Sequence, residues 1–595
     1  MKTSTLFPPL LATAALAWGS PPLSYVGHDT ATTGADGGLR PVVGVHTIQV
    51  FRSNRTATVH ADGLNHTYVH QPMLAWWRGT FYLEYLSAPI NEHDSPTDTS
   101  LTTSTDGINW TTPRLIFPAI ELPGGVRSIT HQRMGFYVAP NNRLLALAFH
   151  GQPPTPNDGT GIGRVVREIR ADGTFGPIYF IRLNARQPCP HFQHPYSLYT
   201  VSRDREFVAA CEALLADKLM TAQWWEEDQR DDSGFYTVKG KALSFVTRPD
   251  GSTLGIWKNA LVATTADRGH TWTTKEFAAN LPNNASKYWL QRTSEGRCAL
   301  VFNPTNRLRH PLALTLSDDG EHFSNLLAVH GELPDQRFGG AYKNLGPQYV
   351  RGIVEGNGTP PDADRAFRLA YSVNKEDIWV ARVPTPIRAT VDTAVHDDFE
   401  PAAPGMLPSE WNIYSPAWAP VRVVDTADSG HALELRDEDP YDYARAVRVF
   451  PATHGVKISL RVRPRQTNAR LEIDLLDAHG ARPVRLAFAE DGFLWACHEG
   501  QWWKAAEYVA DRWQTLVLEI PSNLKADRCA VTLDGETTLS RPAIFTDPVQ
   551  TVERLSLRTG VYRDRGYGGR DLPGADTKVP AAVFLIDDVS ITPLP

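Results

Sequence analysis

One short turn recurs along the first two thirds of the chain, and its repetition limits the fold more than any other feature. Residues 104–110, STDGINW, are one copy, with Asp106 and Gly107 at its centre. Residues 265–272 and 317–323 repeat the pattern, and residues 171–175 keep a degraded form of it. In such a turn the aspartate accepts backbone N–H groups, the glycine adopts a positive φ, and the aromatic residue packs on the sheet. The repetition therefore indicates an array of similar small β-sheets.

The segments between these turns are typical of short strands. FYLEYLS (81–87), LLALAFH (144–150) and FRLAYSV (367–373) are examples, and helix-length periodic runs are scarce. The turn resembles the Asp-box, S-x-D-x-G-x-x-W/F, of sialidase-like β-propellers. The resemblance implies an all-β fold with a propeller over residues 24–390. Because one blade takes about 40–50 residues, we expect a seven-bladed β-propeller, with six blades as the open alternative.

A different strand pattern begins near residue 396 and continues to residue 595. It includes VKISLRVRP (456–464), ARLEIDLLD (469–477) and WQTLVLEI (513–520). These alternating strands predict a C-terminal, concanavalin-like β-sandwich. Such a domain either binds carbohydrate or only packs on the catalytic domain, and the sequence leaves both roles open.

The N-terminus predicts secretion. Lys2, a short apolar run and the small residues Ala17 and Gly19 form a signal peptide over residues 1–19. The five cysteines are too few for a disulfide scaffold and lack metal-ligand spacing, although a Cys189–Cys211 bridge is compatible with secretion. We therefore expect a secreted, extracellular protein.

The composition limits the partners. A formal net charge of −7 gives no basic excess for nucleic acid, and no later apolar segment is long enough to span a bilayer. We expect a monomer that acts without nucleic acid or membrane partners. No cofactor is required by any motif and no metal site is predicted, although a structural Ca²⁺ in the propeller channel is compatible with the sequence.

Several stretches place cationic and aromatic residues together about once per predicted blade. Segments that lead into blades converge on the mouth of a propeller, so these side chains can share one pocket. Guanidinium and ammonium groups there would bind the carboxylate of an acidic sugar, and aromatic rings would cover its apolar faces. The predicted substrate-binding residues are Arg133, Arg164, Arg167, Trp225, Lys287, Tyr288, Arg292, Tyr342, Lys343 and Arg351. The alternative for each arginine is an ion pair between blades.

Longer stretches carry a more specific resemblance. They are residues 66–110, GIGRVVREI (161–169), KYWLQRTSEGRCALVFNP (287–304), GPQYVRGIVEGNG (346–358) and YSVNKEDIWVARVP (371–384). These stretches are similar to the secreted β-propeller L-rhamnose-α-1,4-D-glucuronate lyases, which are related to propeller α-L-rhamnosidases. The resemblance implies a polysaccharide lyase that releases terminal rhamnose from glucuronate on arabinogalactan or gum arabic side chains. The partner would then be an acidic plant-type polysaccharide.

Elimination from glucuronate predicts a catalytic histidine. The carboxylate must be neutralised, H5 removed and O4 protonated, and one histidine can act first as base and then as acid. His70 matches the His-before-Pro element of the lyases and is the first candidate. His131 is the second, and His66 is expected in the same pocket. A structural role is the alternative for each histidine.

Three other functions remain open. A rhamnosidase would need two carboxylates, for which Glu84, Glu92, Glu226 and Glu227 are available. A sialidase would use an arginine cluster with a tyrosine nucleophile, and the Asp-box turns are compatible with it, but the early Arg-Ile-Pro strand that opens sialidases is absent from this sequence. A secreted lectin would need the aromatic residues but no catalytic histidine.

Overall fold

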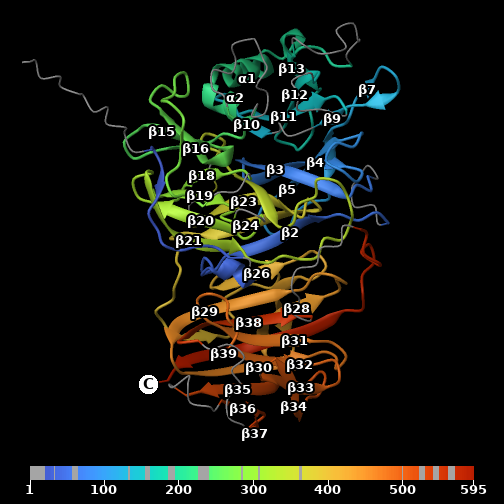
Figure 1. Ribbon diagram of the computed structural model, residues 1–595. Helices are drawn as coiled ribbons and strands as arrows, with labels where there is room; N and C mark the ends of the chain where they lie inside the picture. The colour runs from blue at the N-terminus through green and yellow to red at the C-terminus, as the bar shows by residue number, and fades with distance from the viewer. Residues whose placement is uncertain are drawn as a thin grey trace, which may run out of the picture.

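The computed structural model places a propeller above a β-sandwich (Figure 1). It describes residues 21–594 except residues 33, 57–63, 131–134, 154–160, 185–194, 225–239, 283–285, 306–308, 359, 361–364, 499, 522–528, 540–548 and 561–569. The predicted signal peptide lies outside the described residues. None of the described helices is long and apolar enough to cross a membrane.

Blades 1 to 3 are separate antiparallel sheets in which consecutive strands pair. Blade 1 contains β3 (Tyr68–Trp77), β4 (Thr80–Ala88), β5 (Asp98–Ser104) and β6 (Arg114–Phe117). Blade 2 contains β10 (Gly135–Val138), β11 (Leu144–Gly151), β12 (Gly163–Ile169) and β13 (Tyr179–Leu183), with β9 (Ile129–Thr130) paired to β11. Blade 3 contains β14 (Ser244–Thr247), β15 (Thr253–Trp257), β16 (Leu261–Thr265) and β17 (Glu276–Phe277).

Blades 4 and 5 each recruit a strand from the N-terminal part of the chain. Blade 4 contains β18 (Trp289–Arg292), β19 (Cys298–Phe302), β20 (Leu312–Ser317) and β21 (His322–His330), and β1 (Ser24–Tyr25) pairs with β21. Blade 5 contains β22 (Pro347–Gly352), β23 (Ala366–Val373), β24 (Asp377–Pro384) and β2 (His46–Arg52). The first strands β3, β10, β18 and β22 contact one another between blades, and β14 contacts β18. The first strand of each blade is therefore the innermost.

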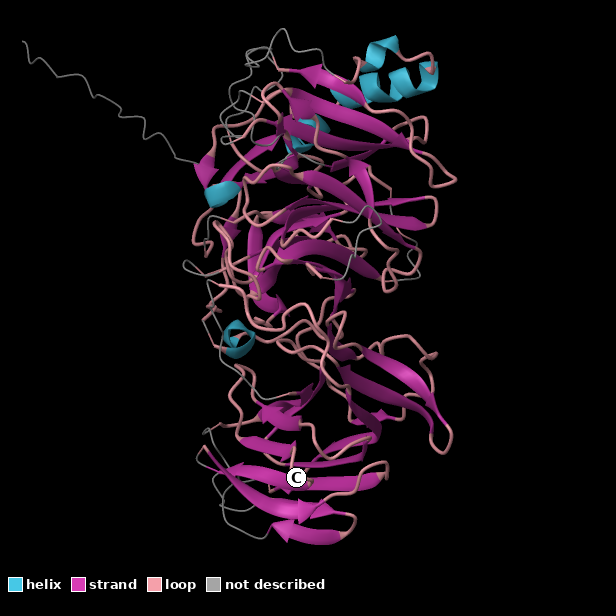
Figure 2. Ribbon diagram, turned by 90° about the vertical axis from the view of Figure 1, so that its right-hand side faces the viewer, coloured by secondary structure: helices cyan, strands magenta, loops and turns pink. Residues whose placement is uncertain are grey.

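The prediction of seven blades is wrong for the described residues. They form four blades that are sheets of their own and a fifth four-stranded group that continues into the sandwich. The error came from the assumed blade length, because long connections separate the sheets. Helices α1 (Arg205–Ala216) and α2 (Lys218–Trp224) lie between blades 2 and 3, and the hairpin of β7 (Glu121–Leu122) and β8 (Val126–Arg127) lies between blades 1 and 2. Figure 2 shows the helices at the end of the propeller remote from the sandwich.

The recurrent turns join the third and fourth strands of blades 1, 3 and 4. In blade 1, Asp106 accepts hydrogen bonds from the N–H groups of Ile108 and Asn109, each at 2.8 Å, and Gly107 has a φ of 74°. Asp267 and Asp319 make equivalent bonds in blades 3 and 4. The all-β propeller with Asp-box turns is thus confirmed.

The C-terminal domain is a sandwich of two antiparallel layers, also as predicted. One layer contains β26 (Trp411–Ser415), β29 (Arg445–Thr453), β38 (Val552–Thr559), β31 (Leu471–Leu476), β32 (Val484–Phe488), β33 (Phe493–His498) and β34 (Gln501–Glu507). The other contains β27 (Val421–Thr426), β28 (Gly430–Asp437), β39 (Ala582–Pro593), β30 (Val456–Pro464), β35 (Gln514–Ile520), β36 (Ala530–Leu533) and β37 (Glu536–Leu539), with β25 (Val395–Asp397) paired to β39. Alternate apolar residues of both layers face each other and form one core.

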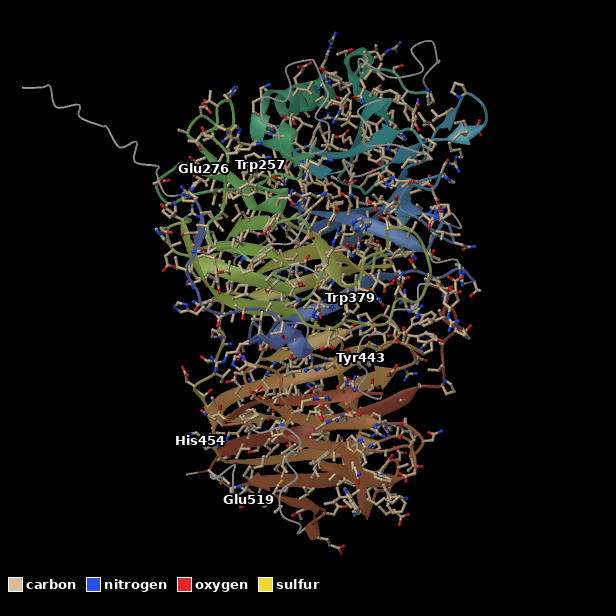
Figure 3. All side chains as sticks on the ribbon, in the orientation of Figure 1. Trp257, Glu276, Trp379, Tyr443, His454 and Glu519 are labelled. Carbon is tan, nitrogen blue, oxygen red and sulfur yellow. The ribbon has the colours of Figure 1, made fainter. Side chains whose placement is uncertain are left out.

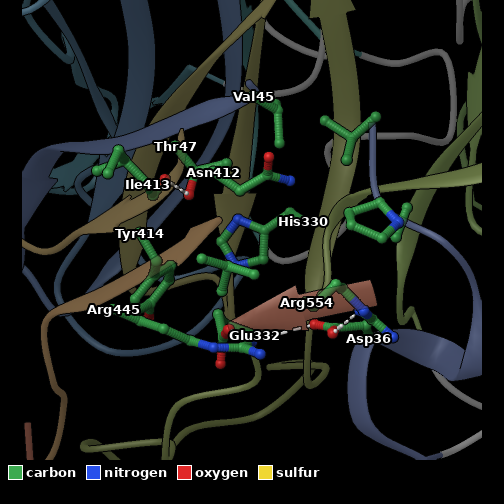
Figure 4. Close-up of a pocket in the computed structure, with 15 residues that line it drawn as sticks. Asp36, Val45, Thr47, His330, Glu332, Asn412, Ile413, Tyr414, Arg445 and Arg554 are labelled. Carbon is green, nitrogen blue, oxygen red and sulfur yellow. Dashed lines mark hydrogen bonds and ion pairs between the residues drawn. The ribbon is translucent and has the colours of Figure 1, made fainter. Parts of the chain in front are cut away.

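Strand β2 joins the two domains, because it pairs with β24 of the propeller and in parallel with β26 of the sandwich. Beside it, Trp379 stacks on Tyr414 with ring centroids 4.8 Å apart, and Tyr443 packs on Tyr414. Figure 3 shows Trp379 and Tyr443 on the two sides of this seam. A cavity of about 50 Å³ lies there, with His330, Glu332, Arg445 and Asp36 around it (Figure 4).

The described cysteines are all buried free thiols. Cys211 is one of them, so it does not form the bridge to Cys189 that the sequence allowed, and Cys189 itself lies outside the described residues. Burial raises the pKa of the Cys211 thiol, which keeps it protonated and unreactive.

Candidate active site at the propeller centre

A cluster of cations and tyrosines forms where the innermost strands begin. It draws on the starts of β3, β18 and β22, and on the connections between the second and third strands of blades 1, 3, 4 and 5. In a propeller these segments share one face, so residues far apart in sequence meet there. We call this group the central cluster; it consists of Tyr68, His70, Gln71, Glu92, Lys258, Lys287, Arg309, Tyr349 and Lys375.

Tyr349 is the focus of the central cluster. The ammonium of Lys258 donates a hydrogen bond of 3.0 Å to its hydroxyl and lies 4.8 Å from its ring centroid. The ammonium of Lys287 lies 4.9 Å from the same centroid, and the guanidinium carbon of Arg309 lies 4.8 Å from it. Arg309 also donates a hydrogen bond to the side chain of Gln348. Three cations therefore surround one phenol, an arrangement that stabilises negative charge at this position.

His70 packs against Tyr349. Its ring centroid lies 4.4 Å from that of Tyr349, and its Nδ1 lies 2.6 Å from Oγ of Ser372. Gln71 follows, and its Oε1 accepts a 2.8 Å hydrogen bond from Lys287. The structure therefore places two predicted residues, His70 and Lys287, in one cluster.

Tyr68, Glu92 and Lys375 form the third part of the central cluster. The ammonium of Lys375 lies 2.9 Å from Oε2 of Glu92 and 5.7 Å from the ring centroid of Tyr68. Burial and then the Glu92 carboxylate raise the pKa of Tyr68 well above its usual range. Burial lowers the pKa of Lys375 to about 8; Glu92 opposes this shift, while Arg309 and Lys258 add to it.

Three residues of the central cluster have strained backbones: Lys375, and on the innermost strands Gln71 and Tyr349. Gln71 has a φ of 54° and Tyr349 a φ of 56°, a region that few residues other than glycine adopt. Each lies at an irregularity in strand pairing, between His70 and Met73 and between Gln348 and Arg351. Such bulges next to a site redirect side chains that a regular strand would point elsewhere.

Most of the other predicted arginines and lysines contact their own surroundings. Arg167 donates to the backbone carbonyls of Gly176 and Ile116. Arg351 donates to the carbonyl of Tyr288, and Lys343 pairs with Glu376. The fully buried Arg164 lies over the ring of Phe149. These contacts are structural, but those of Arg167 and Arg351 go to backbone carbonyls and not to an acid of a neighbouring blade, which was the alternative for each arginine.

The remaining predicted residues are scattered. Arg292 lies at the far end of β18, in a separate surface pocket of about 300 Å³. Tyr288 stacks on Phe302 in the core, whereas Tyr342 is 67% exposed and packs against His93. His66 is buried, with Nδ1 3.0 Å from Oγ of Ser87. The predictions for His131, Arg133 and Trp225 lie outside the described residues.

Sequence reasoning missed three cations of the central cluster. Lys258, Arg309 and Lys375 each lie on a connection between the second and third strands of a blade. In the sequence, Asn374-Lys375 between two alternating strands is typical of an ordinary hairpin turn.

The described residues contain no group of three or more His, Cys, Asp or Glu side chains that could hold a metal ion. The glutamates considered for a hydrolase differ in placement. Glu92 lies in the central cluster, whereas Glu84 is enclosed within blade 1, and burial raises its pKa well above the usual range. Glu226 and Glu227 lie outside the described residues.

Three family models match successive parts of the chain. Residues 21–242 match a BT_1020-like N-terminal β-propeller, residues 235–358 a BNR repeat-like domain, and residues 411–577 a sialidase-like CBM domain. No match was found among curated proteins. The family models name a β-propeller, a BNR repeat-like domain and a sialidase-like CBM domain, and not the rhamnosyl-glucuronate lyases that the sequence motifs resemble.

One solved structure agrees with these family models, and more remote structures also match the chain. A structure described as a sialidase is 38% identical, with a TM-score of 0.90, and the match covers 96% of this chain and 54% of that chain. The chain thus spans about half the length of that protein. Trypanosoma rangeli sialidase in complex with sialic acid is 11% identical, with a TM-score of 0.36, and the match covers 92% of this chain and 96% of that one. Xylan β-1,4-xylosidase from Bacillus halodurans C-125 is 12% identical, with a TM-score of 0.32, and the match covers 94% and 100%. The chain is therefore a sialidase-like β-propeller protein of the BNR type that carries a sialidase-like CBM domain.

Proposed function

We propose that the propeller is a glycosidase that removes a terminal, carboxylate-bearing sugar from a glycan. The observation that carries this proposal is the environment of Tyr349, whose ring and hydroxyl are approached by Lys258, Lys287 and Arg309. Cations drawn from three segments of the chain suit a carboxylate, and the phenol lies among them.

The chemistry favours tyrosine as the nucleophile for such a substrate. A carboxylate nucleophile would be repelled by the carboxylate of the sugar, whereas a phenol approaches it without a charge. Sialidases are the glycosidases that use a tyrosine in this way. The surrounding cations would then stabilise the phenol oxygen when it carries negative charge, in attack and in release of the sugar.

Glu92 completes the proposed machinery. Its ion pair with Lys375 favours the ionised carboxylate, which suits a base more than an acid. When Tyr349 attacks, its phenol proton passes to the leaving oxygen of the glycan. We then assign Glu92 the role of accepting a proton from the water that attacks the sugar, and the Tyr349 oxygen takes up that proton as its bond to the sugar breaks. The 38% identical structure described as a sialidase supports this reaction class.

The second candidate is the lyase that the sequence motifs imply, which would release rhamnose from glucuronate on arabinogalactan side chains. Its supporting observation is that His70, the predicted base, contacts Tyr349 within the same cationic cluster. The cations would neutralise the glucuronate carboxylate, and His70 would move the proton from C5 to O4. In both candidates the partner is an acidic glycan, and for the lyase it is an acidic polysaccharide.

The two candidates differ in their products. We would incubate the purified chain with sialylated glycans, pectic and arabinogalactan polysaccharides, and gum arabic, and identify the released sugars by mass. Release of an intact sugar acid supports the glycosidase. Rhamnose with an unsaturated uronate on the remaining polymer supports the lyase. Binding without release of any sugar contradicts both and leaves a glycan-binding protein.

A further inference from the structure

The hairpin that carries Lys375 has a tip unlike that of an ordinary turn. Hairpin tips are normally exposed, but the four consecutive residues 374–377 are only 1–2% exposed. They are Asn374, Lys375, Glu376 and Asp377, all polar or charged. Burying four such side chains costs free energy unless each is paired, so a tip of this kind needs a reason.

Three of the four tip residues hold the backbone in place. Asn374 accepts a hydrogen bond from the N–H of Gly346 and donates to the carbonyl of Pro334. Glu376 accepts from the N–H groups of Arg337 and Phe338 at 2.9 and 2.7 Å. Asp377 pairs with the guanidinium of Arg337 at 2.6 Å. The tip is therefore anchored on both sides of Lys375.

The backbone of Lys375 itself is fixed to the central cluster. Its φ is 56°, and its carbonyl accepts a 2.9 Å hydrogen bond from the N–H of Val69, between Tyr68 and His70 on β3. This geometry directs the ammonium toward Glu92. The charged or titratable groups that face Lys375 are Glu92, Tyr68, Arg309 and Lys258.

We propose that the buried tip makes Lys375 a positioning residue that keeps Glu92 ionised and cancels its charge, so that the centre stays attractive to an acidic sugar. This inference rests on the proposed function. An ionised Glu92 without Lys375 would repel a carboxylate bound by Lys258, Lys287 and Arg309. In the native pair the charges of Lys375 and Glu92 sum to zero, so Glu92 does not reduce the attraction of the three cations for the sugar carboxylate.

The pH dependence of binding follows from this pair. Because the pKa of Lys375 is about 8, the ammonium loses its proton above that pH and leaves Glu92 as a net negative charge. The affinity for a sugar acid should therefore fall above about pH 8. In Lys375→Met the negative charge appears as soon as Glu92 ionises, so the fall should begin at lower pH.

The test measures binding by calorimetry from pH 5 to 9 with N-acetylneuraminate and D-glucuronate, and with their methyl esters as uncharged controls. We expect Lys375→Met to bind the acid that wild type prefers roughly tenfold more weakly at pH 7.5, and its ester nearly as well as wild type. Lys375→Arg should retain affinity. The double variant Glu92→Gln/Lys375→Met should recover affinity but not turnover, because it lacks the charge and also the base.

Three results would overturn the inference. Lys375→Met with the pH profile of wild type would show that the charge of Lys375 does not matter. A double variant as weak as the single one would show that Lys375 binds the ligand or only supports the fold, and thermal unfolding of all variants separates these two. If wild type binds neither acid, the proposed function fails and the inference fails with it.

Discussion

At the scale of single residues, the central cluster combines backbone strain with concentrated charge. A non-glycine residue at positive φ costs on the order of 1–3 kcal/mol, and Gln71, Tyr349 and Lys375 all adopt this conformation. Lys287 contacts the side chains of both Gln71 and Tyr349. Two strained residues contact the same lysine, and the third, Lys375, faces Arg309 and Lys258. They indicate a site whose geometry is maintained by the surrounding fold at the expense of stability.

Tyr349→Phe tests the role of the phenol oxygen. The variant keeps the ring that the three cations approach but lacks the nucleophilic oxygen. We expect kcat to fall by about three orders of magnitude or more, while the affinity for a sugar acid changes only a few-fold. Rates and calorimetric affinities measured together provide the check. Tyr342→Phe is the matched control, because Tyr342 is 67% exposed and should tolerate the change. Turnover close to wild type in Tyr349→Phe would exclude it as the nucleophile.

His70 distinguishes the two reaction classes. If it only packs on Tyr349 and bonds to Ser372, His70→Gln should lower kcat by about tenfold or less, because an amide can replace one hydrogen bond but cannot shuttle a proton. A loss of about a thousandfold at unchanged affinity would favour the lyase. Ser372→Ala serves as the control for indirect effects on the position of the ring.

Only part of this cluster could be predicted from the sequence, for a physical reason. His70 and Lys287 lie on segments that lead into a blade, where convergence on the centre is expected. Arg351 lies on the first strand of blade 5 and Arg167 on the third strand of blade 2, and both turn toward backbone carbonyls. Strand periodicity does not distinguish this orientation of an arginine from one toward the centre. Lys258, Arg309 and Lys375 lie on connections whose direction depends on how the blades assemble. Residue type alone therefore could not identify them.

At the scale of secondary-structure elements, the recurrent turns stabilise the connection between the third and fourth strands of blades 1, 3 and 4. In blade 1, Asp106 accepts hydrogen bonds from Ile108, Asn109 and Ser104, while Trp110 donates to the carbonyl of Gly107. Each turn satisfies its own backbone groups without help from the rest of the blade. This local self-sufficiency explains why the strands and turns could be predicted from short sequence patterns.

Asp106→Ala should destabilise the propeller because it leaves several of these donors without their acceptor. We expect a loss of about 1–2 kcal/mol in the free energy of unfolding, measured by urea titration. The control is Asp172→Ala in the degraded turn of blade 2, where Thr174 is the one residue among those described that donates to the aspartate side chain. A loss in Asp106→Ala no greater than in the control would contradict a stabilising role for the full motif.

The number of blades could not be predicted in the same way, because it depends on long-range pairing. Strand β2 comes from the N-terminal part of the chain and completes blade 5 beside β24, while β1 joins blade 4. Helices α1 and α2 lengthen the connection between blades 2 and 3. A count based on average blade length therefore gave too many blades, although each individual strand pattern was correct.

At the scale of the whole molecule, the two domains share one sheet and a buried ionic network. Strand β2 pairs with both domains, so the eleven-stranded sheet runs from blade 5 into the sandwich. Beside it, Asp36 of the propeller accepts from Arg445 at 3.1 Å and from Arg554 at 2.7 Å, both of the sandwich (Figure 4). Arg445 also pairs with Glu332. This network should fix the orientation of the sandwich relative to the propeller and couple their unfolding.

Asp36→Asn tests this coupling with the least change in shape. Asparagine tolerates the φ of 51° at this position, but it removes the charge that Arg554 contacts. Removing one partner of a buried ion pair lowers the free energy of unfolding by on the order of 3–5 kcal/mol. Calorimetry should therefore show two separated unfolding transitions in place of one cooperative transition.

The pH dependence of stability gives a second readout for the same variant. Burial would raise the pKa of Asp36, but Arg445 and Arg554 outweigh it and lower the pKa to about 2. The carboxyl pKa is lower in the folded chain than in the unfolded chain, where it is about 4, so the ionised carboxylate stabilises the fold above that pH. This stability is lost as the pH falls toward 2. The asparagine variant should lack that loss. The control is Glu434→Gln, which breaks a surface ion pair with Arg422 within the sandwich domain. It should change the free energy of unfolding little. A single transition in Asp36→Asn, shifted no more than in this control, would show that the shared sheet alone couples the domains.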